Sequence, residues 1–298
     1  MTDTAPAARS HWIRRPEGDL HVLEAGGTGE TGGTGEAGAT GTPVVLLSGA
    51  GVDNALLSWR RLIPALAPRH RVLAPDWPKQ GRSRPWRGKA THSAMLDVVT
   101  AVLDHFGVER AALVGLSQGG ALALAYAIDH PDRVDRLVAL APAGVLSFPP
   151  VVHQLLWLTA KTPLLNSTLP TLALRGRPAV ARFVRGALIP GPTDDFDAVV
   201  DEVHAEVRAS GAGSSDWQND SIGFLRMRVD LRPRLPEIAC PVLFIQGDRD
   251  VGVPPARTAE AARLVPGARL EVLEGHGHWA NRQSPERVNA LIADFLAE

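Results

Sequence analysis

Short apolar runs alternate with longer amphipathic segments along most of this chain. The runs are rich in Val, Leu and Ala and are bounded by Gly, Pro or Asp, as expected of buried strands, whereas the longer segments have helical periodicity. Their alternation predicts a mostly parallel sheet with right-handed crossovers and helices on both faces. The predicted strands are Pro43–Leu47, His70–Ala74, Ala111–Val114, Val134–Leu140, Pro241–Gln246 and Ala268–Leu273. The predicted helices are Leu56–Leu66, Leu96–Phe106, Ala121–Ile128, Ala256–Leu264 and Pro285–Leu296.

A hairpin precedes this alternation, and two segments interrupt it. Trp12–Arg15 and Leu20–Glu24 flank four turn-forming residues and predict a β-hairpin. Residues 26–41 are almost entirely Gly, Thr, Glu and Ala, so we expect a flexible surface loop there. Residues 145–236 contain helical stretches broken by Pro and Gly. We therefore predict a core of residues 1–144 and 237–298, with a helical segment, residues 145–236, inserted after the sixth strand.

Composition and charge exclude several classes of protein. The 298 residues are 45% hydrophobic and 21% charged, with a net charge of -1. This balance is typical of one large α/β domain with an insertion, and it predicts no nucleic-acid or membrane partner. The single cysteine, Cys240, allows neither an intramolecular disulfide nor a cysteine-based zinc cluster. Residues 1–10 have no secretory signal pattern, so we expect a cytoplasmic protein.

The segment Gly115-Leu116-Ser117-Gln118-Gly119-Gly120 joins a predicted strand to a predicted helix. A serine at such a sharp turn projects its hydroxyl out of the backbone, and the glycines on either side allow the tight turn and close helix packing. The backbone N–H of Gln118, at a helix N-terminus, would point toward negative charge that develops beside Ser117. The pattern predicts a nucleophilic serine. Because Gly-x-Ser-x-Gly alone is weakly specific, the prediction depends on finding an acid and a base that would lie near the serine.

An acid and a base follow two later strands of the predicted sheet. Gly247-Asp248-Arg249-Asp250 comes after one strand, and Glu274-Gly275-His276-Gly277-His278-Trp279 comes after the last. Because functional groups of open parallel sheets gather at the carboxyl ends of the strands, we expect the serine, the acid and the base to lie together. A serine hydroxyl needs an imidazole to accept its proton, and the imidazole needs a carboxylate to orient it.

The elbow, the order serine–acid–base and the hairpin followed by alternation resemble the α/β-hydrolase fold family. The resemblance covers the chain except residues 26–41 and the inserted helices, which stand where family members carry a cap. It implies Ser117 as the nucleophile, Asp250 as the acid and His278 as the base. Asp248 and His276 are the alternatives. We expect Asp248 to stabilise its own loop and His276 to lie at the surface or behind the site.

The resemblance also implies an oxyanion hole. Its second donor, besides the N–H of Gln118, would be the N–H of Ala50 in the loop Ser48-Gly49-Ala50-Gly51. Family members usually begin this loop with His-Gly, whereas this chain has Ser48-Gly49. Because the donor is a backbone N–H, we expect this difference to affect the packing of the loop and not catalysis. A further departure is Lys79, where the family has glycine. Lysine tolerates positive φ poorly, so either the turn differs or Lys79 faces the pocket mouth, unless it is an ordinary exposed lysine.

The triad predicts a serine hydrolase that needs neither a cofactor nor a metal and cleaves an ester, lactone or thioester through an acyl-enzyme. An apolar stretch at the start of the insertion, together with Gly49, Trp77, Trp157 and Trp279 near the pocket, favours a hydrophobic small-molecule substrate. Alternatively, that apolar stretch only packs the insertion onto the core.

Other activities stay open at the level of sequence. Carbon–carbon bond hydrolases of ring-cleavage products have the same triad and cap. Glu202 and Glu206, one helical turn apart, could hold a substrate amine in a prolyl aminopeptidase-like peptidase, or simply form a solvated face. A biosynthetic lyase, cyclase or acyltransferase could reuse the site, and a non-catalytic sensor is a further alternative. The sequence defines neither the substrate nor the oligomeric state.

Overall fold

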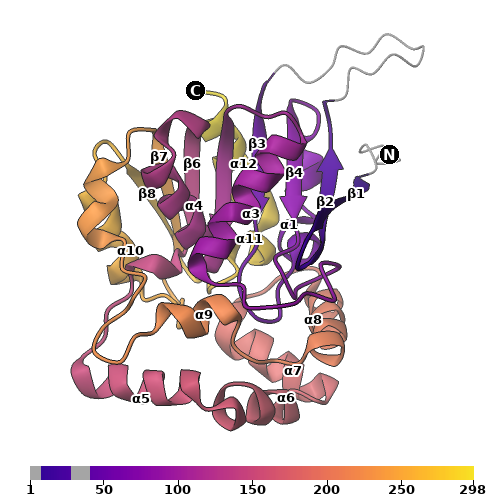
Figure 1. Ribbon diagram of the computed structural model, residues 1–298, viewed down its shortest axis with the longest axis vertical. Coiled ribbons are helices and arrows are strands. Elements are labelled where there is room, and N and C mark those ends of the chain that lie inside the picture. Colours follow the sequence, from indigo (N-terminus) through magenta and orange to yellow (C-terminus); the bar gives the residue numbers. More distant parts are fainter. Residues whose placement is uncertain (1–7, 28–40) are drawn as a thin grey trace.

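An eight-stranded sheet forms the centre of the computed structural model, which describes residues 8–27 and 41–298 (Figure 1). The strands are β1 (Arg9–Arg15), β2 (Gly18–Ala25), β3 (Gly41–Leu47), β4 (His70–Pro75), β5 (Ala111–Leu116), β6 (Val134–Leu140), β7 (Val242–Gly247) and β8 (Arg269–Leu273). They lie in the order β1-β2-β4-β3-β5-β6-β7-β8. β2 pairs antiparallel with β1 and β4, and every other pair is parallel. The predicted fold class is confirmed.

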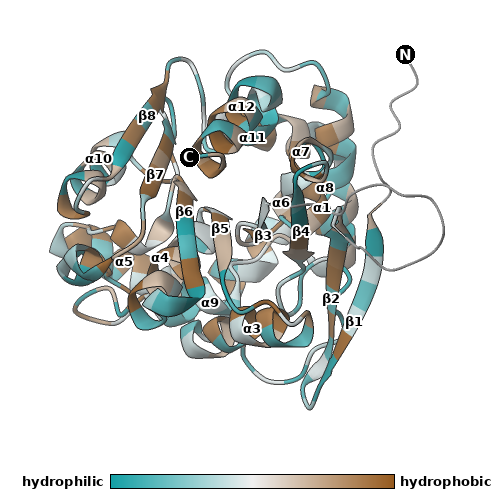
Figure 2. Cartoon of the chain, turned by 90° about the horizontal axis from the view of Figure 1, so that it is seen from above, coloured by the Kyte–Doolittle hydropathy of each residue, from teal (hydrophilic) through white to brown (hydrophobic). Residues whose placement is uncertain are grey.

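Helices cover both faces of the sheet, as Figure 2 shows from above. Because successive strand residues point to opposite faces, Val45 and Leu47 join one apolar cluster while Val44 and Leu46 join the other. The first cluster includes residues of α3, α4 and α10, and the second includes residues of α1, α2, α11 and α12. The bounds are α1 (Ala55–Trp59), α2 (Ile63–Leu66), α3 (His92–His105), α4 (Gln118–Asp129), α10 (Pro255–Leu264), α11 (Ala280–Gln283) and α12 (Pro285–Leu296). Short 3₁₀ turns are Pro131–Arg133, Ala143–Val145 and Arg232–Glu237.

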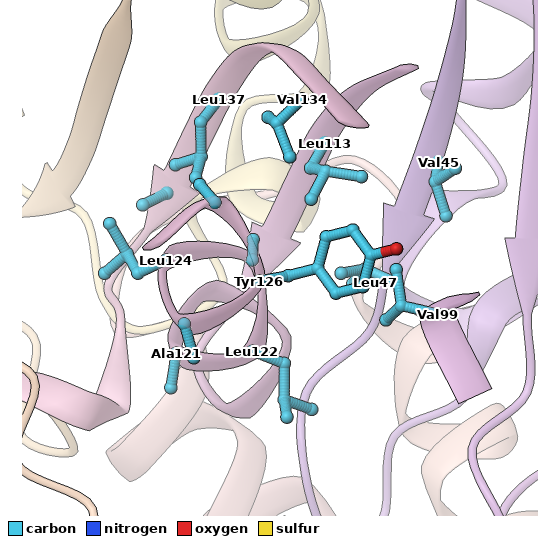
Figure 3. Packing of buried hydrophobic residues seen from close by; sticks show 14 of the residues in the cluster. Val45, Leu47, Val99, Leu113, Ala121, Leu122, Leu124, Tyr126, Val134 and Leu137 are labelled. Atoms are coloured by element: carbon cyan, nitrogen blue, oxygen red, sulfur yellow. The ribbon is translucent and has the colours of Figure 1, made fainter. Parts of the chain in front are cut away.

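The helix that follows the elbow, α4, is buried from Gln118 to Ile128. Its Ala-rich sequence lets it lie close to the sheet, and Figure 3 shows Leu122 and Tyr126 packed near Leu47 and Val99. Burial around a whole helix is typical of the interior of a large protein. The first residue of α4 therefore has little freedom to move, which fixes the position of the adjacent serine.

Between β6 and β7 the chain forms a helical segment that lies beneath the carboxyl ends of the central strands in Figure 1. Its elements are α5 (Pro150–Lys161), a π-helical turn (Leu164–Thr168), α6 (Leu169–Ala173), α7 (Arg177–Phe183), a second π-helical turn (Val184–Leu188), α8 (Phe196–Ser210) and α9 (Asp216–Ser221). Within the described ranges, none of the helices has the length and hydrophobicity to cross a bilayer.

Some predicted elements differ in the structure. The helix expected over Leu56–Leu66 is divided into α1 and α2, because Pro64 has no N–H to continue the helical ladder. Within the insertion, α9 ends at Ser221, and Ile222 bridges to Met227. The loop predicted at residues 26–41 falls mostly on residues 28–40, which lie outside the described residues.

Candidate active site

Ser117 occupies the sharp turn between β5 and α4, with φ 54° and ψ −113°. A non-glycine residue in such a conformation costs roughly 1–3 kcal/mol and persists only where its surroundings hold it. Here its N–H donates to the Leu140 carbonyl of β6 at 2.8 Å. A β carbon at Gly119 would lie 2.1 Å from the Leu47 carbonyl oxygen, and one at Gly115 would lie 2.3 Å from the Gly119 carbonyl oxygen. The glycines of the elbow are therefore required by close backbone packing.

His278 and Asp250 form a hydrogen-bonded pair, with Nδ1 2.7 Å from Oδ2. The other carboxylate oxygen of Asp250 accepts from the N–H groups of Gly252 at 2.7 Å and Val253 at 2.9 Å. Burial alone would raise the pKa of Asp250, but the hydrogen bond and charge of His278, with the bonds from Val253 and Gln246, outweigh burial and lower it. Asp250 is therefore ionised at neutral pH and holds the imidazole with Nε2 as its proton acceptor.

The two alternative residues have other partners. Asp248 accepts from the N–H of Gly275 at 2.7 Å, which stabilises its own loop. His276 bonds the Glu274 carbonyl oxygen through Nδ1 and the Ser284 hydroxyl through Nε2, both at 2.7 Å. Both of its ring nitrogens are therefore occupied by groups that fix the chain before α12. Neither residue lines the cavity that contains Ser117.

Ser117 and His278 line one cavity of about 480 Å³ between the sheet edge and the inserted helices. Within residues 8–27 and 41–298, no hydrogen bond joins the serine hydroxyl to the imidazole. Catalytic hydrogen bonds in unliganded enzymes are often long and tighten when substrate binds. The arrangement thus places a serine hydroxyl and an oriented imidazole on the same cavity wall.

The loop predicted as the oxyanion hole is held from three sides. Asp53 accepts from the N–H of Gly49 at 2.7 Å, Trp77 donates to the Ser48 carbonyl at 2.8 Å, and Gln80 donates to the carbonyls of Gly49 and Gly51 at 3.3 and 3.2 Å. Ala50 lines the cavity. Among the described residues, no group accepts a hydrogen bond from the N–H of Ala50 or from that of Gln118. Two backbone donors are thus left free beside Ser117.

The four predicted pocket residues divide into two pairs. Gly49 and Trp279 lie in the cavity lining. The prediction was wrong for Trp77, which is completely buried beneath the oxyanion loop and joins the core through its indole. It was also wrong for Trp157, which is not part of the cavity lining and packs edge-on against Phe224, with the two ring centroids 4.9 Å apart.

The rest of the cavity wall is mostly apolar and comes largely from the insertion. The sequence alone did not single out these residues, because their positions depend on how the inserted helices pack. The additional lining residues are Gly51, Val52, Pro170, Ala173, Leu174, Phe183, Leu188, Ala212, Gly213, Ser214 and Gln218. No Lys, Arg, Asp or Glu side chain is part of the lining that the structure describes.

Residues 42–285 match the model of the alpha/beta hydrolase fold family. The chain belongs to this family. It is 31% identical over 276 residues to a 2-hydroxymuconate semialdehyde hydrolase of Pseudomonas sp. (strain CF600), covering 86% of this chain and 87% of that one. It is also 31% identical over 260 residues to a putative carbamate hydrolase of Caulobacter sp. (strain K31), covering 85% and 90%. An enol-lactonase from Burkholderia xenovorans LB400 has the same fold, with a TM-score of 0.71 at 24% identity and coverage of 97% and 100%. This protein is accordingly an enzyme of the α/β-hydrolase fold.

Asp53 supports the site from behind the cavity, and sequence reasoning missed it as well. Its carboxylate is fully buried and also accepts from the Ser58 hydroxyl at 2.6 Å and the Asn54 N–H at 2.8 Å. Burial raises the pKa of Asp53 to about 6, although these hydrogen bonds and the charge of Arg282 act in the opposite direction. The available signal was a lone acid inside an otherwise apolar stretch, directly after the oxyanion loop.

Lys79 has φ 70°, so the turn keeps the left-handed conformation that glycine adopts more readily. Its ammonium group is partly exposed and lies 2.7 Å from the Asp216 carboxylate of α9. Lys79 lines a smaller compartment of about 160 Å³ that shares Gly51, Gly213 and Ser214 with the main cavity. The residue therefore faces a compartment beside the cavity and also links the core to the insertion.

Proposed function

We propose that this enzyme is a serine hydrolase that cleaves an ester, lactone or thioester of an uncharged, hydrophobic small molecule. The observation that carries the proposal is the placement of Ser117 and the oriented imidazole of His278 on one cavity wall, beside two backbone N–H groups that have no acceptor among the described residues. We further propose that residues 145–236 act as a cap, because many of the residues that close the cavity come from this segment.

The geometry supports a two-step reaction. His278 Nε2 takes the proton of the Ser117 hydroxyl as Oγ attacks the carbonyl carbon, and the resulting oxyanion accepts from the N–H groups of Ala50 and Gln118. The imidazolium, stabilised by ionised Asp250, then gives its proton to the leaving alkoxide or thiolate. Water attacks the acyl-enzyme by the same proton path and releases the acid and free Ser117.

The lining argues for a neutral substrate. A buried carboxylate or ammonium group requires an opposite charge or several strong hydrogen bonds. The described lining supplies no Lys, Arg, Asp or Glu side chain, and we propose that its one imidazole, His278, serves in proton transfer. Phe183, Leu174 and Leu188 provide apolar contact surface instead. A hydrophobic acyl or alkyl group therefore fits this cavity better than an ionised one.

Carbon–carbon bond hydrolysis is the second candidate, favoured by the similarity to the 2-hydroxymuconate semialdehyde hydrolase. A muconate semialdehyde carries a carboxylate at neutral pH, and the described lining has no Lys or Arg to receive it. A peptidase that holds a substrate amine is disfavoured. Glu202 bonds Arg60 and Arg282, Glu206 bonds Arg84, and neither acid lines the cavity.

A substrate panel separates these activities. We expect the protein to hydrolyse neutral p-nitrophenyl esters and lactones with a clear preference over vinylogous diketone carboxylates and aminoacyl anilides. The Ser117→Ala variant serves as the background control for each substrate. Faster turnover of the anionic diketone than of any neutral ester would replace the proposed activity with carbon–carbon bond cleavage.

A further inference from the structure

The outer side of the insertion exposes an unusual number of large apolar side chains. Most of the large hydrophobic residues that are exposed in the described protein lie in this segment, and several of them are more than half exposed. We call this surface the outer cap face. Its members are Val151, Val152, Leu155, Leu158, Leu164, Leu165, Leu169, Leu172, Phe224 and Leu225.

The spacing of these residues gathers them into stripes. Val151, Leu155 and Leu158 recur at the i, i+4, i+7 positions of α5, so they share one side of that helix. Leu165 and Leu172 continue the apolar surface through the π-helical turn and α6. The edge-on contact of Trp157 with Phe224 places the loop that carries Phe224 and Leu225 against α5. Figure 1 shows α5 and α6 at the side of the molecule remote from the C-terminus.

The stretches that carry this face, residues 150–175 and 222–228, contain Lys and Arg but no Asp or Glu, and Asp220 of α9 is an acid that lies near Lys161. From residue 136 to residue 193 the chain contains no Asp or Glu, although it contains Arg and Lys. Lys161 ends α5, Arg175 follows α6, and Arg226 follows Leu225. Within the described residues, none of these three forms an ion pair, and all three are exposed. The near-zero net charge of the whole chain conceals this local excess of cations.

We propose that the outer cap face docks on an anionic lipid surface. Its members are aliphatic except for Phe224, and aliphatic side chains flanked by Lys and Arg are the combination that binds at the boundary of head groups and acyl chains. A second copy of this chain is a poorer occupant. In a two-fold interface each patch meets itself, so the unpaired cations around one copy would approach those of the other.

The position of α6 connects this surface to the site. Pro170, Ala173 and Leu174 line the active-site cavity, whereas Leu169 and Leu172 of the same short stretch are exposed on the outer cap face. One helical turn thus separates the docking surface from the cavity wall. Docking would hold the cavity next to a reservoir of apolar molecules. The binding itself does not depend on the catalytic activity proposed above.

Vesicle co-sedimentation tests this proposal on the intact protein. The probes are mixed phosphatidylcholine–phosphatidylglycerol vesicles and pure phosphatidylcholine vesicles. Wild-type protein is expected to sediment with the mixed vesicles, more weakly with the neutral ones, and less at high salt. The double variant Leu155→Ser/Leu172→Ser should bind the mixed vesicles roughly 100-fold more weakly, at about tenfold for each leucine withdrawn from lipid.

A matched control removes an exposed apolar residue elsewhere. Val272, on edge strand β8, is 49% exposed, close to the 60% of Leu155 and 59% of Leu172, and Val272→Ser should bind like wild type. Hydrolysis of a water-soluble ester and thermal melting verify that both variants are folded. The proposal is overturned if wild type stays in the supernatant, if the double variant binds as well as wild type, or if neutral vesicles bind equally. It is also overturned if wild type is a dimer that the double variant converts to a monomer without any vesicle binding.

Discussion

Replacement of Asp53 by asparagine separates the stability of this enzyme from its activity. The carboxylate is fully buried behind the oxyanion loop and accepts from Gly49, Asn54 and Ser58. A carboxamide has only one acceptor oxygen. If that oxygen keeps the hydrogen bonds from Gly49 and Ser58, the NH₂ group of the new asparagine faces the N–H of Asn54. Two hydrogen-bond donors then point at each other. The loop that carries the N–H of Ala50 must then shift.

The expected changes follow from the burial of this charge. The pKa of Asp53 is raised from 3.8 to about 6 in the folded protein. At about 1.4 kcal/mol per unit, keeping the group ionised costs the folded state about 3 kcal/mol. This cost is absent at pH values below the pKa of Asp53 in the unfolded chain. It grows as the pH rises toward the pKa of Asp53 in the folded protein, and it is complete above that value. Because asparagine does not titrate, the stability of Asp53→Asn relative to wild type should rise by about 3 kcal/mol between about pH 4 and about pH 7.

The activity should change in the opposite direction. A displaced oxyanion donor is expected to lower kcat by about 100-fold with little change in KM, since the donor acts mainly in the transition state. Denaturant titrations at several pH values and steady-state kinetics on a chromogenic ester measure the two effects. Asp104→Asn is the control, because Asp104 is 61% exposed and should show neither effect. An unchanged kcat, or a stability difference that is constant with pH, would refute this role of Asp53.

Three other substitutions test separate parts of the site. Asp250→Asn should lower kcat by about 10⁴-fold with little loss of binding, because the carboxamide favours the wrong tautomer of His278; kinetics that match wild type would remove Asp250 from the triad. Lys79→Gly relieves the φ of 70° and loses a partly exposed ion pair with Asp216, so denaturant titration should show a stability gain of up to about 1 kcal/mol with kcat retained. A fall in kcat would instead give Lys79 a role in the reaction. Gly119→Ala places a β carbon 2.1 Å from a β3 carbonyl oxygen, so we expect little folded protein in circular dichroism; a stable, active variant would contradict the elbow packing.

The sequence was sufficient to predict the fold and to nominate Ser117, Asp250 and His278. Strand–turn–helix patterns are local, and side chains that follow parallel strands must gather at one edge of the sheet. The position of Gln118 at a helix N-terminus nominated its N–H, and the resemblance to the α/β-hydrolase fold family nominated that of Ala50; neither N–H has an acceptor among the described residues. These positions depend on backbone topology, which the apolar pattern encodes directly.

The remaining features depend on side-chain packing between distant segments. Whether an indole points into a cavity or into the core is decided by its neighbours, so Trp77 and Trp157 could not be placed from the sequence. The burial of Asp53 likewise requires the loop around Gly49 to close over it. The outer cap face was not predicted, because the apolar stretch at the start of the insertion was expected either to lie near the pocket or to pack on the core. The structure instead leaves Val151, Leu155 and Leu158 of this stretch exposed.

Active-site labelling tests the central claim most directly. The protein is incubated with a fluorophosphonate probe, and intact mass measurement and peptide mapping then locate the adduct. The account predicts one adduct per chain, on Ser117, that forms much more slowly in the His278→Ala variant and is absent in Ser117→Ala. A folded protein that remains unlabelled, or that carries the adduct on another residue, would contradict the assignment of Ser117 as the nucleophile.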